Sequence, residues 1–242
     1  MLQLLQLLQL LRRRRVLLRL LIPRRELDTA CCPIASCNIE GGSMRLLVIG
    51  ATGRTGAHVL EQGVARGHEV TAFTRKPELL KGREGLRAVV TGDATDLPTV
   101  REAVAGQDAV ISAVGTSGIA RTLIAAMRET GVRRVVMTSS RSIPATRPRL
   151  AVGLAWLFFR SAYVDLARAE GMLEVSGLDW TIVRATMLTG KPANGRLHVD
   201  FEANATGGEA TLPRADYATA LLDAAEDDAM IGRTPGVCGA RA

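Results

Sequence analysis

The larger part of the chain alternates short apolar runs with stretches of helical periodicity. Nearly continuous apolar runs, as expected of strands buried on both faces, occupy 44–50, 68–74, 86–91, 108–114, 133–139 and 179–184. Helix-compatible stretches occupy 54–67, 97–104, 119–130 and 162–175, and several of them end at a glycine. Strands separated by helices of this length require parallel crossovers. The pattern predicts one α/β domain over residues 44–242, built on a doubly wound parallel sheet.

Residues 1–43 do not fit that pattern. They combine a leucine and glutamine repeat with seven arginines, and no acidic residue precedes Glu26. The arginines follow the apolar part, unlike a secretory signal, and no apolar run reaches the roughly 18 residues of a membrane span. Three interpretations remain: a start assigned upstream of a true start at Met44, a targeting or membrane-surface segment, or a disordered tail. We expect the first, because Glu40-Gly41-Gly42 is encoded by the purine-rich codons of a bacterial ribosome-binding sequence.

Composition and charge narrow the function classes. Hydrophobic residues make up 47% and charged residues 23%, which excludes a disordered chain. Aromatic residues, at 3%, are too few for a platform that stacks single-stranded nucleic acid. Of the net charge of +7, residues 1–43 carry +4, so the predicted domain is nearly balanced. We therefore expect no nucleic-acid partner and no stable membrane insertion.

The four cysteines add little chemistry. Three of them lie within residues 1–43, in a spacing without a neighbouring histidine. This arrangement predicts neither a disulfide framework nor a metal site. We expect a reducing, cytoplasmic location.

A glycine-rich loop follows the first predicted strand. Its sequence is Gly50-Ala51-Thr52-Gly53-Arg54-Thr55-Gly56. Gly50 permits a tight turn, Gly53 lets the backbone approach a pyrophosphate, and Gly56 lets the helix pack on the strand. Free backbone N–H groups at the start of a helix bind phosphate. Because the loop joins a buried strand to a helix, it predicts a dinucleotide site that also includes Thr52, Arg54 and Thr55.

The end of the second strand selects between dinucleotides. A carboxylate there would bind the ribose 2′-hydroxyl of NAD and repel a 2′-phosphate. This chain has Thr74-Arg75-Lys76 instead, with no acidic residue before Glu78. Arg75 and Lys76, with Arg54 from the glycine loop, therefore predict NADP(H) as the cofactor. The alternative is a solvated basic turn.

The ends of the next two strands are predicted to line the same cofactor. The candidate contacts are Asp93, Ala94, Ala113, Gly115 and Thr116. Asp93 suits an adenine amino group and equally suits the cap of the helix that begins near Leu97. The small residues after the fourth strand leave room for the pyrophosphate and ribose.

The end of the fifth strand supplies the candidate catalytic residues, Ser139 and Ser140. A hydroxyl at this position would hydrogen-bond the nicotinamide carboxamide or a substrate carbonyl. Helix or turn capping is the competing interpretation.

These motifs together resemble a known family. GATGRTG, FTRKP, VVTGDATD, DAVISAVGT, VRRVVMTSS, SGLDWTIVRATMLTG and PRADYA are similar to the atypical short-chain dehydrogenase/reductases, especially the biliverdin-IXβ reductase/flavin reductase type and the NmrA-like NAD(P)-binding proteins. The resemblance covers Met44 to about Gly239. It implies a single Rossmann-fold domain with a small C-terminal cap. Related enzymes reduce flavins, quinones or tetrapyrroles with NADPH, whereas other relatives bind the nucleotide only and report redox state.

The chain departs from those families at residues that carry acid–base chemistry. Tyr163 is followed four residues later by Ala167, so the Tyr-x-x-x-Lys pair of ordinary short-chain dehydrogenases is absent. Relatives often carry lysine or histidine near Leu166, and biliverdin-reducing members have histidine where Met187 stands. Hydride transfer to a small planar acceptor, a flavin or a quinone, needs little acid–base equipment. We expect an NADPH-dependent oxidoreductase of that type; the alternative is a non-catalytic redox sensor.

An aromatic stretch at 154–159 (LAWLFF) lies where relatives place a loop over the substrate. It suits an acceptor-binding wall, a partner surface or plain core. Among the histidines, we expect His58 and His68 to lie beside the first helix. We expect His198 to lie on a surface hairpin of the cap rather than to catalyse.

Overall fold

The computed structural model describes residues 42–147, 149–204 and 208–241, and the predicted extension 1–43 falls almost entirely outside them. The main sheet has eight strands in the order β3-β2-β1-β4-β5-β6-β10-β8. These are β1 (Arg45–Ile49), β2 (Glu69–Thr74), β3 (Leu86–Thr91), β4 (Ala109–Ser112), β5 (Arg134–Ser140), β6 (Asp179–Ala185), β8 (Leu197–Asp200) and β10 (Gly236–Gly239). All neighbours pair in parallel except β8 and β10. The predicted doubly wound sheet is confirmed.

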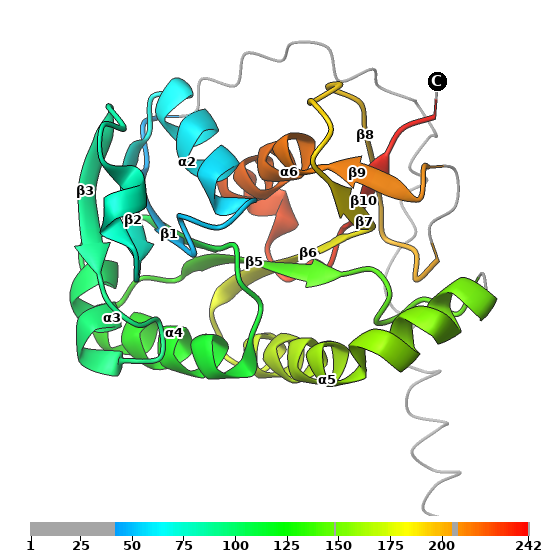
Figure 1. Ribbon diagram of the computed structural model, residues 1–242. Coiled ribbons are helices and arrows are strands. Elements are labelled where there is room, and N and C mark those ends of the chain that lie inside the picture. The colour runs from blue at the N-terminus through cyan, green and yellow to red at the C-terminus, as the bar shows by residue number, and fades with distance from the viewer. Residues whose placement is uncertain (1–41, 148, 205–207, 242) are drawn as a thin grey trace, which may run out of the picture. The chain divides into compact units, whose positions relative to one another are not determined.

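Helices cover both faces of the sheet (Figure 1). One layer holds α2 (Gly56–Ala65) and α6 (Arg214–Glu226), and the other holds α3 (Leu97–Val104), α4 (Ser117–Thr130) and α5 (Arg149–Glu174). Short 3-10 turns, η1 (Pro77–Leu80) and η2 (Asp228–Met230), complete the helical elements of the described chain. A buried hydrophobic cluster fills the space between the sheet and each layer. The central strand β1 is buried on both faces, as its continuous apolar run predicts.

The C-terminal region was only partly predicted. The expected small cap corresponds to a separate two-stranded parallel sheet of β7 (Met187–Thr189) and β9 (Thr211–Pro213). The chain then returns through α6 and β10 to the main sheet, two elements that the sequence pattern did not single out. Most residues of α6 are buried. Because its sequence is rich in alanine, apolar and polar positions alternate too weakly to show which side of the helix faces the core. β10 has only four residues, too few to show an alternation of apolar and polar positions.

The longest helix begins well before its predicted start. α5 runs from Arg149, and its backbone is non-helical at one residue, Phe159. The stretch 154–159 therefore lies on a helix and not on a loop, and its core interpretation is wrong. Leu154, Leu157 and Phe158 are between 55% and 74% exposed. Within the described ranges, no helix is long and apolar enough to cross a membrane.

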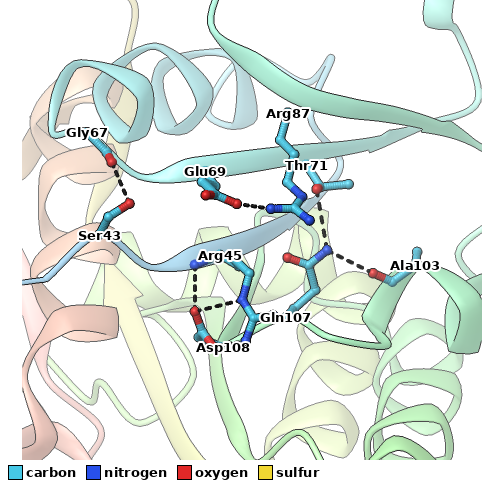
Figure 2. Close-up of polar contacts among 9 residues, drawn as sticks. All are labelled: Ser43, Arg45, Gly67, Glu69, Thr71, Arg87, Ala103, Gln107 and Asp108. Carbon is cyan, nitrogen blue, oxygen red and sulfur yellow. Dashed lines mark hydrogen bonds and ion pairs between the residues drawn. The ribbon is translucent and has the colours of Figure 1, made fainter.

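Polar contacts tie the strands together at the amino edge of the sheet (Figure 2). The guanidinium of Arg45 on β1 donates to Asp108, with Nη2 2.7 Å from Oδ1. Gln107 Nε2 donates to Thr71 Oγ1 of β2 at 3.3 Å, and Arg87 of β3 pairs with Glu69. The hydrogen bonds of Arg45 hold the pKa of Asp108 below its usual range. This edge is thus occupied by structural ion pairs, and the opposite, carboxyl edge carries the predicted site.

Candidate functional site

The glycine loop has the geometry that its three glycines predict. Gly50 has φ +77°, a left-handed conformation that favours glycine, and a methyl group added there would stand 2.5 Å from Val114 Cγ2. A methyl group at Gly56 would overlap the carbonyl of Gly50, so α2 packs directly on the turn. At Gly53 the nearest atom to such a methyl group is Gly50 O, at 3.0 Å, and the rest of the space is open. The loop therefore presents bare backbone on its outer side.

The start of α2 offers free donors. Within the described residues, the backbone N–H groups of Thr52, Arg54 and Gly56 donate to no protein acceptor, whereas that of Gly53 donates to Gly50 O at 2.9 Å. The first turn of α2 contains no acidic side chain, and Thr55 precedes it without a side-chain cap. Unpaired N–H groups at a helix N-terminus attract anions through both hydrogen bonding and the helix dipole. This is the arrangement that a pyrophosphate requires.

The carboxyl end of β2 lies beside the loop. Thr52 Oγ1 and Thr74 Oγ1 are 2.8 Å apart, and Thr74 Oγ1 also accepts from the backbone N–H of Lys76 at 3.0 Å. The side chains of Arg54, Arg75 and Lys76 are exposed. No carboxylate ends this strand.

A fourth cation, Arg214, approaches the same place. Burial at the start of α6 lowers the pKa of Arg214, and the nearby positive charge of Arg54 lowers it further. Sequence reasoning missed this residue because more than 150 positions separate it from the glycine loop. Only the packing of α6 beside α2 brings the two guanidinium groups together.

After β3, the structure separates the two roles considered for Asp93. The carboxylate of Asp96 caps α3 by accepting from the backbone N–H of Thr99 at 3.2 Å, so the capping interpretation of Asp93 is wrong. Asp93 Oδ1 instead accepts from the backbone and hydroxyl of Thr95 at 2.8 and 2.7 Å. These bonds, with a smaller contribution from the charge of Arg75, lower the pKa of Asp93. Asp93 is exposed, and Ala94 packs on the core beneath it.

The end of β4 is tightly packed. Ala113 donates its backbone N–H to Ile49 O at 3.0 Å, which holds β4 against the start of the glycine loop. A methyl group at Gly115 would stand 2.5 Å from Thr138 O and 3.3 Å from Leu166 Cδ1. Thr116 caps α4 through its side chain. This strand end therefore lies between the loop and β5, and the absence of a side chain at Gly115 allows the close approach of Thr138 on β5.

The two candidate catalytic serines at the end of β5 differ in their surroundings. Ser139 is buried, and its hydroxyl donates to Glu170 Oε1 at 2.6 Å. Ser140 Oγ accepts from the backbone N–H of Ser142 at 3.2 Å and is partly exposed. The capping role considered for this pair thus applies to Ser140, within a turn.

A buried ion pair supports Ser139, and sequence reasoning missed it. Glu170 of α5 accepts from Arg184 of β6 through two bonds, Nε to Oε1 at 3.0 Å and Nη2 to Oε2 at 2.7 Å. Glu170 is 5% exposed. Glu170 lies on the same helix as Tyr163, seven residues after it. Tyr163 is the tyrosine that has no lysine four residues later.

A second buried network lies on the other side of β5. Tyr217 of α6 donates its hydroxyl to Val183 O at 2.7 Å and lies 2.6 Å from Thr138 Oγ1. Complete burial raises the pKa of Tyr217. The sequence contained a signal for it, since Tyr217 is the tyrosine of the PRADYA motif.

Of the three histidines, His68 and His198 lie apart from the glycine loop, whereas His58 lies on α2 as expected. His68 binds Glu226 at 2.8 Å near the amino edge, and His198 lies on β8, in the main sheet rather than in a separate hairpin. Among the described residues, no group of three metal-ligating side chains occurs. The cofactor candidates, by contrast, all follow β1, β2, β3 or β4, whose carboxyl ends share one edge of the sheet.

A family model described as NAD(P)H-binding matches residues 50–228, which include the glycine loop and every strand end described above. The chain belongs to this NAD(P)H-binding family. The predicted resemblance to atypical short-chain dehydrogenase/reductases is confirmed at this level.

The proteins that are similar to this chain have different names and described functions. Sterol demethylase protein B of Methylococcus capsulatus is 31% identical over 192 residues, covering 65% of this chain and 57% of the relative. The chain thus spans little more than half the length of that relative. Among solved structures, ChuY, an anaerobilin reductase from Escherichia coli O157:H7, is 25% identical with a TM-score of 0.70, covering 81% of this chain and 97% of ChuY. A short-chain dehydrogenase/reductase of Veillonella parvula in complex with NADP, 20% identical, shares the fold with a TM-score of 0.70 over 81% of this chain and 94% of that chain.

Proposed function

We propose that this protein is an NADPH-dependent oxidoreductase that transfers hydride to a small planar acceptor of the flavin or quinone type. The observation that carries the proposal is the glycine loop, whose unpaired N–H groups at the start of α2 stand beside Arg54, Arg75 and Lys76. The membership in the NAD(P)H-binding family and the reductase ChuY among the structural relatives support it.

The residues present fit the dinucleotide. The open space at Gly53 lets backbone N–H groups hydrogen-bond the pyrophosphate, which a side chain there would block. Arg75 and Lys76 would hold the 2′-phosphate, together with Arg54. Asp93, Ala94, Ala113, Gly115 and Thr116 would line the adenine and ribose. When bound, NADPH supplies a hydride, and its reaction with a quinone consumes one proton to give NADP⁺ and the hydroquinone.

The protein's own contribution to the chemistry would be positional. Ser139 and Ser140 end β5, where the nicotinamide and acceptor are expected. Because Ser139 donates to Glu170, its oxygen keeps a free lone pair that can accept a hydrogen bond from a carboxamide. Ser140, whose hydroxyl is partly exposed, would orient the acceptor carbonyl.

A second function, a non-catalytic redox sensor, is favoured by one observation. Tyr163 packs between aromatic rings, with its ring centroid 5.4 Å from that of Trp156, and no lysine follows it at the required spacing. A protein that only reports the NADPH to NADP⁺ ratio needs the same nucleotide site and no acceptor. Turnover therefore separates the two functions, and nucleotide binding does not.

The first experiment measures NADPH oxidation by the full chain, with FMN, riboflavin and a quinone as acceptors. We expect turnover that saturates with acceptor. Gly53→Val should abolish both nucleotide binding and turnover, whereas Gly171→Val, the same substitution at an open helical position of α5, should retain both. Binding of NADPH without reduction of any acceptor would favour the sensor. Absence of NADPH binding would refute both functions.

The cofactor preference has its own test. Arg75→Glu places a carboxylate where the 2′-phosphate is expected. A charge-assisted contact contributes about 1.5–3 kcal/mol, so Arg75→Glu should lower the preference for NADPH over NADH by about ten- to a hundredfold. Lys81→Glu, an equal charge change after η1, serves as the control. An unchanged ratio of kcat/KM values for the two cofactors in Arg75→Glu would contradict the assignment.

A further inference from the structure

The first half of α5 presents an apolar face to solvent. Leu150, Leu154, Leu157 and Phe158 are between 55% and 84% exposed. Their spacing of four, three and one residues places them on one side of the helix. Large exposed apolar patches on a folded domain mark interaction sites.

The opposite side of this half-helix is anchored to the domain. Trp156 donates its indole N–H to Ser142 O at 3.0 Å, and its ring meets the edge of Tyr163. Figure 1 shows this half of α5 at the periphery of the domain, past the end of β5. These contacts of Trp156 hold the helix in place, so its opposite, apolar face is directed to solvent by the fold.

The charged residues of this segment have one sign. Residues 147–164 contain Arg147, Arg149 and Arg160 and no aspartate or glutamate. The next acidic side chain, Asp165, already accepts the backbone N–H of Ser117 at 3.1 Å. An apolar stripe flanked by arginines is typical of helices that lie in the interface of an anionic membrane.

We propose that the first half of α5, Arg149–Phe159, docks the protein on an anionic lipid bilayer. The leucine and phenylalanine side chains enter the interface, and the arginines contact the lipid phosphates. A second copy of the chain fits this face less well. A two-fold contact would bring the arginines of both copies together without an acidic residue in 147–164 to neutralise them.

Co-sedimentation of the full chain with lipid vesicles tests the proposal. We expect binding to phosphatidylglycerol vesicles, weaker binding to phosphatidylcholine vesicles, and a loss of affinity with added salt. The double substitution Leu157→Ser/Phe158→Ser should weaken binding by about tenfold or more. Leu79→Ser/Val175→Ser removes two exposed apolar side chains outside this face, 60% and 81% exposed, and should leave binding unchanged. The seven arginines of residues 1–43 are present in both variants, so the difference between them reports on α5 alone.

A fluorescence measurement on the unaltered surface gives an independent result. The chain has two tryptophans, Trp156 and Trp180. Brominated lipid should quench part of the emission, and Trp156→Phe should remove that part. Equal vesicle binding by the two double variants would overturn the proposal. A stable dimer that Leu157→Ser/Phe158→Ser dissociates would also overturn it, because a second copy would then cover the face.

Discussion

Replacing Glu170 with alanine should destabilise the fold more than any substitution on the surface of α5. The carboxylate is 5% exposed and accepts three hydrogen bonds, two from Arg184 and one from Ser139. Glu170→Ala leaves a guanidinium in a largely buried position without its counter-charge. The cost is therefore mainly that of an unpaired buried cation and not the net contribution of the pair.

The structure sets the size of this effect. Breaking a buried ion pair from one side typically costs about 3–5 kcal/mol. The side chain of Arg184 is 18% exposed, so water partly compensates and the lower value, about 3 kcal/mol, is expected. For a domain of about 200 residues, that corresponds to a fall in Tm of roughly 6–12 °C.

Urea unfolding followed by circular dichroism measures the free energy of unfolding for the variants. Glu174→Ala, an exposed glutamate at the end of the same helix, is the control and should change stability by less than about 0.5 kcal/mol. Glu170→Leu/Arg184→Met removes both charges and should be clearly more stable than Glu170→Ala. A loss below about 1 kcal/mol for Glu170→Ala, or a double variant no more stable than the single one, would refute this account of the pair.

Two further predictions concern packing and pH. Gly56→Ala should destabilise the fold by about 1–3 kcal/mol, because the added methyl group overlaps the turn. Gly171→Ala, in open space on α5, should stabilise the fold by about 0.5–1 kcal/mol. Thermal unfolding measures both effects, and equal effects would contradict the close approach at Gly56. Burial raises the pKa of Tyr217, so its contribution to stability is complete below the unfolded pKa near 10 and is lost as pH rises toward the folded pKa. Urea unfolding at pH 8 and pH 10.5 should therefore show a smaller loss of stability for Tyr217→Phe than for the unaltered chain, and an equal loss would disprove the burial argument.

The sequence alone determined the features that depend on neighbouring residues. The continuous apolar run of β1 and the glycines that follow it predict the turn between β1 and α2, because a buried strand and a bare backbone are local requirements. The proposed role of the basic residues after β2 likewise rests on the local sequence alone. The turn at Gly50 and the close helix approach at Gly56 agree with the roles assigned to them, since the left-handed φ of Gly50 favours glycine and the backbone of the turn leaves no room for a methyl group at Gly56.

Tertiary structure decided the features that depend on distant contacts. The sequence shows Glu170, Arg184 and Ser139 as three unrelated polar residues, and only the packing of α5 on β5 and β6 joins them. Arg214 lies close enough to Arg54 for their positive charges to interact because α6 lies beside α2. The geometry of the turn after β3 also decides which backbone N–H each carboxylate accepts. Asp96 caps α3, a role that the sequence also allowed for Asp93.

The same distinction explains the first half of α5. Its sequence is apolar enough to suit a core, a wall or a partner surface, because hydrophobic periodicity gives a helix face but not what covers that face. The structure leaves Leu157 and Phe158 exposed to solvent. The first half of α5 extends past the end of β5, so the sheet does not cover these side chains. Local sequence thus predicts the glycine turn between β1 and α2, whereas long-range packing determines which buried charges are paired and which apolar surface remains exposed.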